Sequence, residues 1–313
     1  MSKKVAFLFP GQGAQYIGMG KDFYEQFPVA KRVFEEADAI LGRSLSSLIF
    51  TGDKEELLQT KNSQPAIYVT SFAMHQVLQS ACPDLIPYAC AGLSLGEYTA
   101  LAASGKISFA EGLQLVAKRA MLMQEACSIT PGSLRVVLGM EEEAVRLALA
   151  SCQGDSYACI ANLNCPGQIV IAGTIKGLDL ATEELKKCGA KRVLPLEVSG
   201  AFHSNLMLSA KEGLRPALLE VSLVETPPLL VMNTKGGFVL EPLEIRLNLI
   251  EQITSPVLWQ KGIEVLDKRV DFFLEIGCGK TLQGMNKRIG VKSPTYGIET
   301  VEELKKFVQE ERG

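Results

Sequence analysis

The segment Cys90 to Ala100, CAGLSLGEYTA, narrows the possible folds of this chain more than any other. It leads from a short apolar run, residues 88–91, through Gly92-Leu-Ser-Leu-Gly96 into a segment with alanines that suit a helix. Two glycines around one serine permit a sharp turn between a buried strand and a helix, which is typical of α/β folds. Such a turn would lift the Ser94 hydroxyl out of the fold, where it could act as a nucleophile.

The same residues also fit a purely structural role for Ser94. Ser94-Leu-Gly-Glu97 matches the S-x-x-E capping box, in which a serine side chain accepts a hydrogen bond from the free N–H groups at a helix start. Considered alone, the segment leaves both interpretations open. The strand before it and the helix after it favour the nucleophile.

A nucleophilic serine needs a base within hydrogen-bond reach, usually a histidine, and the chain has two. His75 is expected inside a helix that starts at Ser63-Gln-Pro-Ala66, with Pro65 in its first turn, and ends near Ser80. His203 lies in the loop-like stretch SGAFHS. If Ser94 is a nucleophile, His203 is therefore the base by elimination.

The region between Pro131 and Val198 has the pattern of a self-contained unit. We predict strands at 134–140, 157–163, 168–172 and 192–198, and helices at 141–150 and 178–187. This β-α-β-β-α-β order is the ferredoxin-like arrangement, whose two ends lie close together. The fold class predicted is α/β, with a large domain at 1–128 and 199–313 and an inserted ferredoxin-like small domain at 129–198.

The rest of the large domain follows an alternation of strands and helices. The apolar runs 4–9 and 272–276 predict buried strands, and 19–41 has continuous helical spacing. Ser108-Phe-Ala-Glu111 is a second capping box, which predicts a helix that continues to about residue 126.

Composition disfavours several classes of function. No stretch has the roughly 18 uninterrupted apolar residues of a spanning helix, and the apolar run after Lys4 is too short for a signal peptide, so we expect a cytoplasmic protein without membrane contact. A net charge of −3 disfavours nucleic acid as a partner. Eight cysteines without a C-x-x-C pair indicate reduced thiols and no zinc site. We expect no bound metal.

Six motifs occur in an order that resembles the malonyl-CoA:acyl carrier protein transacylases of fatty acid synthesis. They are Phe9-Pro-Gly-Gln-Gly13, Gly92-Leu-Ser-Leu-Gly-Glu97, Val116-Ala-Lys-Arg-Ala-Met121, Asn164-Cys-Pro-Gly-Gln168, Gly200-Ala-Phe-His-Ser204 and Glu275-Ile-Gly-Cys-Gly-Lys280. The resemblance extends from about Phe7 to Arg288. It implies an α/β-hydrolase-like large domain with a ferredoxin-like insertion, in agreement with the pattern above. It also implies transfer of malonyl groups from malonyl-CoA to the phosphopantetheine thiol of acyl carrier protein, without a further cofactor.

The resemblance implies roles for single residues. Ser94 would carry the malonyl group as an ester in a ping-pong reaction, and His203 would accept and return its proton. The backbone carbonyl of Gln252 would orient the histidine. The N–H groups of Gln12 and Leu95 would form the oxyanion hole.

Substrate choice is implied to depend on Arg119, which would pair with the free carboxylate of the malonyl group. Without the resemblance, Arg119 beside Lys118 would be interpreted as a surface charge on a helix. Phe202, Leu93 and Asn164 are further candidates for the substrate pocket. Lys280, Lys287 and Arg288 are available to meet the acidic carrier protein or the coenzyme phosphates. We expect a monomer.

The chain departs from the family's pattern at two positions. The residue before the nucleophile is usually histidine but here is Leu93, so the surroundings of Ser94 should be less polar than usual. Arg135 stands where small or apolar residues are more common, and the sequence leaves open whether it points outward or toward the cleft.

Two other functions stay open. A serine hydrolase would use the same serine and histidine, but it would normally have a carboxylate between them in the sequence. Asp155 and Asp179 lie in that interval, within the predicted small domain. A binding module without catalysis would leave Ser94 as a helix cap.

Overall fold

The computed structural model describes residues 3–198 and 200–312. The predicted domain limits at residues 1, 199 and 313 therefore lie outside the described residues. Two sheets organise the chain. One has six strands and the other has four.

The six-stranded sheet is largely parallel. Its order is β10-β9-β1-β2-β7-β8, in which β8 alone runs antiparallel to its neighbour. The strands are β1 (Val5–Phe9), β2 (Ala89–Gly92), β7 (Leu229–Met232), β8 (Gly237–Val239), β9 (Phe272–Ile276) and β10 (Thr295–Ile298). β1, β2 and β9 are buried along their whole length, as the apolar runs predict for central strands of a parallel sheet.

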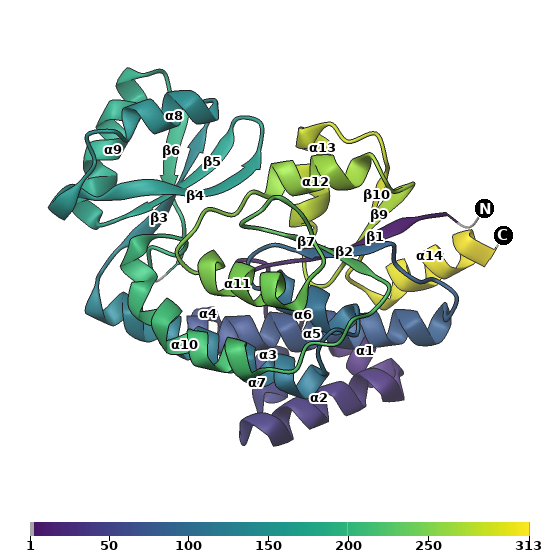
Figure 1. Cartoon of the computed structure of the whole chain (residues 1–313). Helices are drawn as coiled ribbons and strands as arrows, with labels where there is room; N and C mark the ends of the chain where they lie inside the picture. Colours follow the sequence, from purple (N-terminus) through teal and green to yellow (C-terminus); the bar gives the residue numbers. More distant parts are fainter. Residues whose placement is uncertain (1–2, 199, 313) are drawn as a thin grey trace.

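Helices cover both faces of this sheet (Figure 1). Because side chains alternate along a strand, Phe7 and Phe9 pack toward one face and Leu8 toward the other. The first face carries α5 (Thr60–Ala81), α6 (Gly96–Ala103) and α7 (Phe109–Ile129), and the second carries α12 (Trp259–Asp267) and α13 (Thr281–Ile289). The remaining helices are α1 (Lys21–Gln26), α2 (Pro28–Leu41), α3 (Leu45–Thr51), α4 (Lys54–Leu58), η2 (Asn205–Met207), α10 (Leu208–Glu220), α11 (Pro242–Gln252) and α14 (Val301–Arg312).

Two helix predictions in this part of the chain are wrong in detail. Residues 19–41 form two helices, since Pro28 starts α2 and Phe27 before it is extended. α5 begins at Thr60, so Pro65 lies inside the helix and not in its first turn. The helix tolerates this because the Lys61 carbonyl, which loses its helical donor at Pro65, accepts a hydrogen bond of 3.4 Å from the Arg43 Nη2.

The four-stranded sheet is antiparallel and forms with its two helices the unit between Ser133 and Pro195. Its order is β4-β5-β3-β6, and the chain follows the predicted succession β-α-β-β-α-β. The elements are β3 (Ser133–Leu138), α8 (Glu142–Ala148), η1 (Gly154–Ser156), β4 (Ala158–Cys165), β5 (Gln168–Gly173), α9 (Ile175–Lys187) and β6 (Arg192–Pro195). α8 and α9 pack on one face of the sheet around Val137, Ile160 and Ile171. The other face is turned toward the large sheet (Figure 1).

A backbone connection joins the two parts of the molecule. Val257, which follows α11, donates a hydrogen bond to the Ala161 carbonyl (2.8 Å) and accepts one from the Leu163 N–H (2.9 Å). β4 therefore pairs with a segment of the larger part only a few residues after Gln252.

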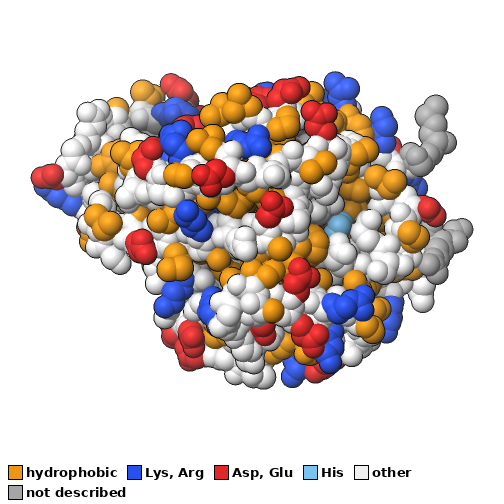
Figure 2. Space-filling view, turned by 60° about the horizontal axis from the view of Figure 1, so that its bottom comes forward, with side chains coloured by type: hydrophobic (Ala, Val, Ile, Leu, Met, Phe, Trp, Pro, Cys, Tyr) orange, Lys and Arg blue, Asp and Glu red, His pale blue; other side chains and the backbone are white. Residues whose placement is uncertain are grey.

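On the face shown in Figure 2, the coloured Lys and Arg side chains are interspersed with Asp and Glu, so this face offers no extended basic surface among the described residues. No helix within residues 3–198 and 200–312 is long and apolar enough to cross a membrane.

Candidate active site

Ser94 lies on a sharp turn between β2 and α6. Its φ of 52° places a residue with a side chain in the left-handed region, which favours glycine. The flanking glycines make this turn possible. A Cβ at Gly92 would lie 1.9 Å from the Gly96 carbonyl carbon, and one at Gly96 would lie 2.2 Å from the Phe9 carbonyl oxygen. α6 begins at Gly96 without a side-chain cap, so the Ser94 hydroxyl is not used as a helix cap.

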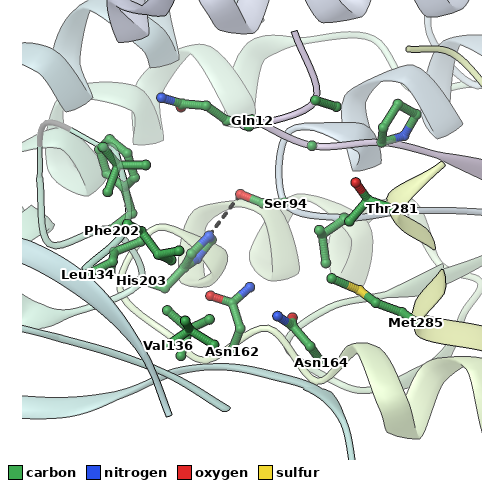
Figure 3. A pocket seen from close by; sticks show the side chains of 18 of the residues that line it. Gln12, Ser94, Leu134, Val136, Asn162, Asn164, Phe202, His203, Thr281 and Met285 are labelled. Atoms are coloured by element: carbon green, nitrogen blue, oxygen red, sulfur yellow. Dashed lines mark hydrogen bonds between the residues drawn. The ribbon is translucent and has the colours of Figure 1, made fainter. Parts of the chain in front are cut away.

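The Ser94 hydroxyl meets His203. The distance from Ser94 Oγ to His203 Nε2 is 2.8 Å (Figure 3). His203 Nδ1 lies 2.7 Å from the Gln252 carbonyl oxygen. Because a carbonyl only accepts, Nδ1 carries the proton and Nε2 is left as an acceptor for the serine hydroxyl. Burial, followed by the nearby Arg119 charge, lowers the pKa of His203 to about 4. The imidazole is therefore neutral at physiological pH and suited to accept a proton.

His75 occupies a different environment. It lies on α5 among the rings of Phe7, Phe9 and Phe72, and burial lowers its pKa to about 4. The partner of the Ser94 hydroxyl is His203, as elimination predicted, and not His75.

Arg119 is buried, with the residue only 1% exposed, so its interpretation as a surface charge is wrong. From α7 its guanidinium donates to Gln64 Oε1 (2.5 Å), Gln252 Oε1 (2.9 Å) and Ser94 Oγ (3.0 Å). Among the described residues its acceptors are two amides and a hydroxyl, and no carboxylate bonds to it directly. A buried guanidinium with neutral partners is suited to receive an anionic group next to the serine oxygen.

The two predicted oxyanion-hole residues come from separate loops. Gln12 follows β1 and lines the pocket, while Leu95 directly follows Ser94 and is buried. Within the described part of the chain, neither backbone N–H donates to another backbone group. The two loops touch, since a Cβ at Gly11 would lie 2.4 Å from the Leu93 carbonyl oxygen. The Gln12 side chain contacts Thr60 and Gln64 at the start of α5 (both 3.3 Å).

A cavity of about 250 Å³ opens in front of Ser94. The three pocket candidates Leu93, Asn164 and Phe202 all line it. Figure 3 shows Asn164 and Phe202 around the cavity. The sequence prediction missed other residues of its wall, among them Gln64, Met123, Leu134, Val136, Asn162, Thr281 and Met285. Strand alternation could have found some of them, because Asn162 and Asn164 are two residues apart on β4 and share one face, as Leu134 and Val136 do on β3.

Arg135 points away from this cavity. Its guanidinium donates to the Leu178 carbonyl (2.8 Å), to Thr182 Oγ1 (2.6 Å) and to Asp179 Oδ1 (2.5 Å), all on α9. Asp179 therefore forms an ion pair with Arg135, and the Asp179 side chain is 63% exposed. The group that contacts His203 Nδ1 is a backbone carbonyl and not the carboxylate that a typical serine hydrolase would supply.

Two buried polar residues behind Ser94 were missed as site residues, and so was the part that the side chain of the predicted residue Gln252 plays beside them. Asn233, Glu97 and the side chain of Gln252 form hydrogen bonds around the turn. Burial raises the pKa of Glu97 to about 8, although its hydrogen bonds and the Arg119 charge act in the opposite direction. The only sequence signal was Glu97 itself, which the capping-box interpretation assigned to the helix start.

No metal centre is seen in the part of the chain that the structure describes, because no three His, Cys, Asp or Glu side chains are arranged to hold an ion. A serine and a neutral histidine in a pocket with a buried guanidinium can form and break an acyl ester. The class of protein that this chemistry defines is an acyltransferase, and the model of the acyl transferase domain family matches residues 6–234.

The resemblance drawn from the six motifs is confirmed by individual relatives. The malonyl CoA-acyl carrier protein transacylase of Bacillus subtilis (strain 168) is 44% identical over 308 residues, which cover 98% of this chain and 96% of that protein. The chain belongs to the family of malonyl CoA-acyl carrier protein transacylases.

Solved structures agree with this assignment. The transacylase of the same name from Clostridium perfringens superposes with a TM-score of 0.93 at 37% identity, with 99% of this chain and 97% of that chain covered. A malonyl-transacylase in complex with its type II PKS acyl-carrier protein gives a TM-score of 0.92 at 34% identity, with 98% and 99% covered. The mixed α/β fold with a mainly parallel sheet matches these structures.

Proposed function

We propose that this protein transfers malonyl groups from malonyl-CoA to the phosphopantetheine thiol of acyl carrier protein, through an ester on Ser94, and so supplies malonyl carrier protein for fatty acid synthesis. The observation that carries the proposal is the Arg119 guanidinium, which donates to Ser94 Oγ at 3.0 Å. An acyl group on that oxygen would place a carboxylate within reach of the same guanidinium. An acetyl group has no carboxylate to pair with it.

The first half-reaction forms the ester. His203 Nε2 removes the proton from Ser94 Oγ, which attacks the thioester carbonyl carbon of malonyl-CoA. The carbon–sulfur bond breaks, and the leaving thiolate takes the proton from the imidazolium. The Gln252 carbonyl 2.7 Å from Nδ1 supports this role, because it keeps Nε2 free to accept. The N–H groups of Gln12 and Leu95 would stabilise the oxyanion, a contribution of about 3 kcal/mol for each donor.

The second half-reaction reverses the order of events. The carrier-protein thiol gives its proton to His203 Nε2, and its sulfur attacks the carbonyl carbon of the ester. Ser94 Oγ leaves and recovers the proton. A neutral imidazole is needed at the start of both halves, which agrees with a pKa lowered to about 4.

The pocket residues shape the space for the acyl chain. Leu93 and Phe202 give it apolar walls, and Asn164 brings a buried amide oxygen that has no partner among the described residues. We assign these three to substrate binding. Each step of the transfer is served by side chains and backbone groups of this chain, so we propose no cofactor beyond the two thioester partners.

The domain arrangement that we propose places this pocket at a junction. An α/β-hydrolase-like domain at 1–128 and 199–313 would contribute Ser94, Arg119 and His203, and a ferredoxin-like domain at 129–198 would contribute Asn164. The strand order β4-β5-β3-β6 and the pocket walls drawn from both regions support this division.

Carrier-protein binding is proposed for the exposed end of α13. Met285 of this helix lines the pocket, while Lys287 and Arg288 are exposed on the same helix. Arg288 Nη1 also donates to Gln168 Oε1 on β5 (2.9 Å), next to the pocket. Lys280 is engaged by Glu303 and contributes less positive charge. An acidic carrier protein bound there would direct its thiol arm toward Ser94.

Intact-mass measurement tests the function. Mixing with malonyl-CoA should add one malonyl group, peptide mapping should locate it on Ser94, and holo acyl carrier protein should remove it. Rapid loss of the adduct in buffer alone would indicate a hydrolase. Failure to form an adduct would indicate a binding protein. Ser104→Ala is a suitable control, because this buried hydroxyl, directly after α6, donates to the Leu101 carbonyl in the last turn of that helix.

A further inference from the structure

The strained turn at Ser94 is held by one side chain from a distant strand end. Asn233, just after β7, accepts a hydrogen bond from the Ser94 N–H at its Oδ1 (2.7 Å). Its Nδ2 donates to the Gly92 carbonyl (2.8 Å). A single side-chain amide thus bonds to the backbone on both sides of Leu93, where the chain leaves β2. A left-handed residue other than glycine persists only where its surroundings fix it in this way.

The peptide group after Ser94 is held by a second amide. Gln252 Nε2 donates to the Ser94 carbonyl at 2.8 Å. The peptide bond that begins at this carbonyl is planar and ends in the Leu95 N–H, so fixing the carbonyl oxygen also fixes the direction of that N–H. In the proposed function, this Leu95 N–H is one of the two donors of the oxyanion hole.

Glu97 connects the two amides. The residue is 2% exposed, and one carboxyl oxygen accepts a hydrogen bond from the Asn233 N–H (2.6 Å). The other oxygen accepts a short hydrogen bond from Gln252 Nε2. Gln252 in turn accepts from Arg119 through Oε1 and from His203 through its backbone carbonyl. The Glu97 carboxyl group is therefore hydrogen-bonded to Gln252, and Gln252 in turn contacts Ser94, Arg119 and His203.

We propose that Glu97 and Asn233 are positioning residues, which together hold the Ser94 turn and direct the Leu95 N–H at the site of the developing oxyanion. This inference rests on the proposed function, since it assumes that Ser94 is acylated. Neither side chain touches the substrate in this arrangement. Both act through Ser94, Leu95 and Gln252.

The chemistry of the neighbours explains why a carboxyl group is needed at position 97. Both groups that face it, the Asn233 N–H and the Gln252 Nε2, are donors, and a carboxyl group can accept a hydrogen bond at each of its two oxygens whether it is ionised or protonated. Glutamine has the same shape, but one of its two ends carries an NH₂ group. Glu97→Gln would therefore set a donor against a donor at one contact, without opening a cavity, and Gln252 would lose its hold on the Ser94 carbonyl.

The expected defect lies in the chemical step and not in substrate binding. Loss of an oxyanion donor typically slows catalysis by about 100-fold to 1000-fold. We expect Glu97→Gln to lower the rate of Ser94 acylation at saturating malonyl-CoA by about 100-fold, with KM for malonyl-CoA within about threefold of the wild type. A purely structural role would lower the fraction of folded protein and leave the rate per folded molecule unchanged.

The experiment is rapid-quench acylation with malonyl-CoA, followed by intact-mass detection, with rates divided by the folded fraction from circular dichroism. Asp267→Asn is the matched control, because Asp267 also accepts hydrogen bonds from two backbone N–H groups, those of Lys292 and Ser293. These groups lie just before the start of β10, whereas Ser94 follows the carboxyl end of β2. It should keep the wild-type acylation rate. Asn233→Ala is the second variant, since it keeps the backbone N–H that bonds to Glu97 and removes only the contacts to Ser94 and Gly92. It should show the same loss of rate with little change in KM.

The outcomes separate this inference from the proposed function. A wild-type protein that forms no malonyl ester would overturn the function itself. A wild type that acylates, beside folded Glu97→Gln or Asn233→Ala variants with the wild-type rate per folded molecule, would overturn the positioning role. A loss that appears only in KM would overturn it as well, because the side chains would then serve binding.

Discussion

Ser94 and His203 are the two residues other than glycine that have a positive φ in the part of the chain that the structure describes, and their side chains meet at 2.8 Å. Each conformation costs about 1 to 3 kcal/mol relative to an ordinary backbone. Strain is therefore concentrated at the two ends of one hydrogen bond. The close approach of Gly92 and Gly96 permits the strained conformation of Ser94. This packing therefore serves the geometry of the site more than the stability of the fold.

Replacement of Ser94 separates strain from chemistry. Ser94→Gly and Ser94→Ala should both abolish malonyl-ester formation, because neither has a hydroxyl. Glycine has no Cβ and adopts φ near 52° without a clash, so Ser94→Gly should be about 1 kcal/mol more stable than Ser94→Ala. Urea unfolding of both variants measures the difference. An alanine variant as stable as the glycine variant would show that the turn carries no strain.

Gly11 tests the contact between the two loops of the predicted oxyanion hole. A Cβ at this position would lie 2.4 Å from the Leu93 carbonyl oxygen, so Gly11→Ala must push the Gln12 loop away from the Ser94 turn. Displacement of one donor should lower kcat by about 100-fold, and KM should change much less. The measurement is steady-state transfer to carrier protein.

Gly284→Ala is the matched control for that change. Gly284 lies inside α13, and a Cβ there would meet nothing within 4 Å. Because alanine is the better helix former, this variant should gain about 0.5 to 1 kcal/mol in stability and keep its activity. An equal loss of kcat in both variants would argue against a specific role for the Gln12 loop.

The buried histidines should make the protein less stable in acid, while the raised pKa values of the buried carboxyl groups Glu97 and Glu275 act in the opposite direction. The pKa of His75 is lowered by burial from 6.5 to about 4, so between these values the unfolded chain binds a proton that the folded chain does not. The resulting stabilisation is complete above pH 6.5 and is lost as the pH falls toward 4. His203 contributes in the same direction.

The His75 contribution can be measured by substitution. At pH 5 the wild type should have lost about 2 kcal/mol through this residue alone, relative to pH 7. His75→Leu removes the titrating group from its setting of Phe7, Phe9 and Phe72, so the change in its free energy of unfolding from pH 7 to pH 5 should be about 2 kcal/mol less unfavourable than that of the wild type. Urea unfolding of both proteins at pH 7 and at pH 5 measures this. The same pH-dependent change in the wild type and in His75→Leu would refute the lowered pKa of His75.

Local patterns predicted most secondary structure, and the errors have physical causes. The β-α-β-β-α-β succession could be predicted because each strand alternates and each helix has its own apolar stripe. The break between α1 and α2 was missed because helical spacing continues through Pro28. The early start of α5 was missed because a hydrogen bond from distant Arg43 compensates for Pro65.

The site was predictable where its residues belong to local motifs, and not where they meet only in space. Asn233 contacts Ser94 across 139 positions, and no pattern near either residue indicates the other. Glu97 was visible in its motif but was interpreted as part of a helix cap, since a sequence cannot show that both of its oxygens face donors from elsewhere. The burial of Arg119 was hidden for the same reason, because its acceptors come from α5, the Ser94 turn and α11.

Arg119 provides the sharpest test of substrate choice. Arg119→Ala would leave Gln64 Oε1 and Gln252 Oε1 without their buried donor, so it should cost about 1 to 3 kcal/mol of stability at each. A lower rate with malonyl-CoA alone would not distinguish this structural damage from a loss of contact with the malonyl carboxylate. The informative quantity is the ratio of kcat/KM for malonyl-CoA to that for acetyl-CoA, because structural damage affects both donors alike.

An unpaired buried carboxylate costs about 3 to 5 kcal/mol, so the malonyl-to-acetyl ratio should fall by at least two to three powers of ten in Arg119→Ala. Arg119→Lys should recover part of the ratio, since an ammonium keeps the charge but loses the planar fork that grips two oxygens. Arg135→Ala is the matched control: it removes a guanidinium that bonds to three groups of α9 and faces away from the cavity. It should lower stability and leave the ratio unchanged. If Arg119→Ala also left the ratio unchanged, the guanidinium would have no part in recognising the malonyl carboxylate, and its charge would serve Ser94 and Gln252 alone.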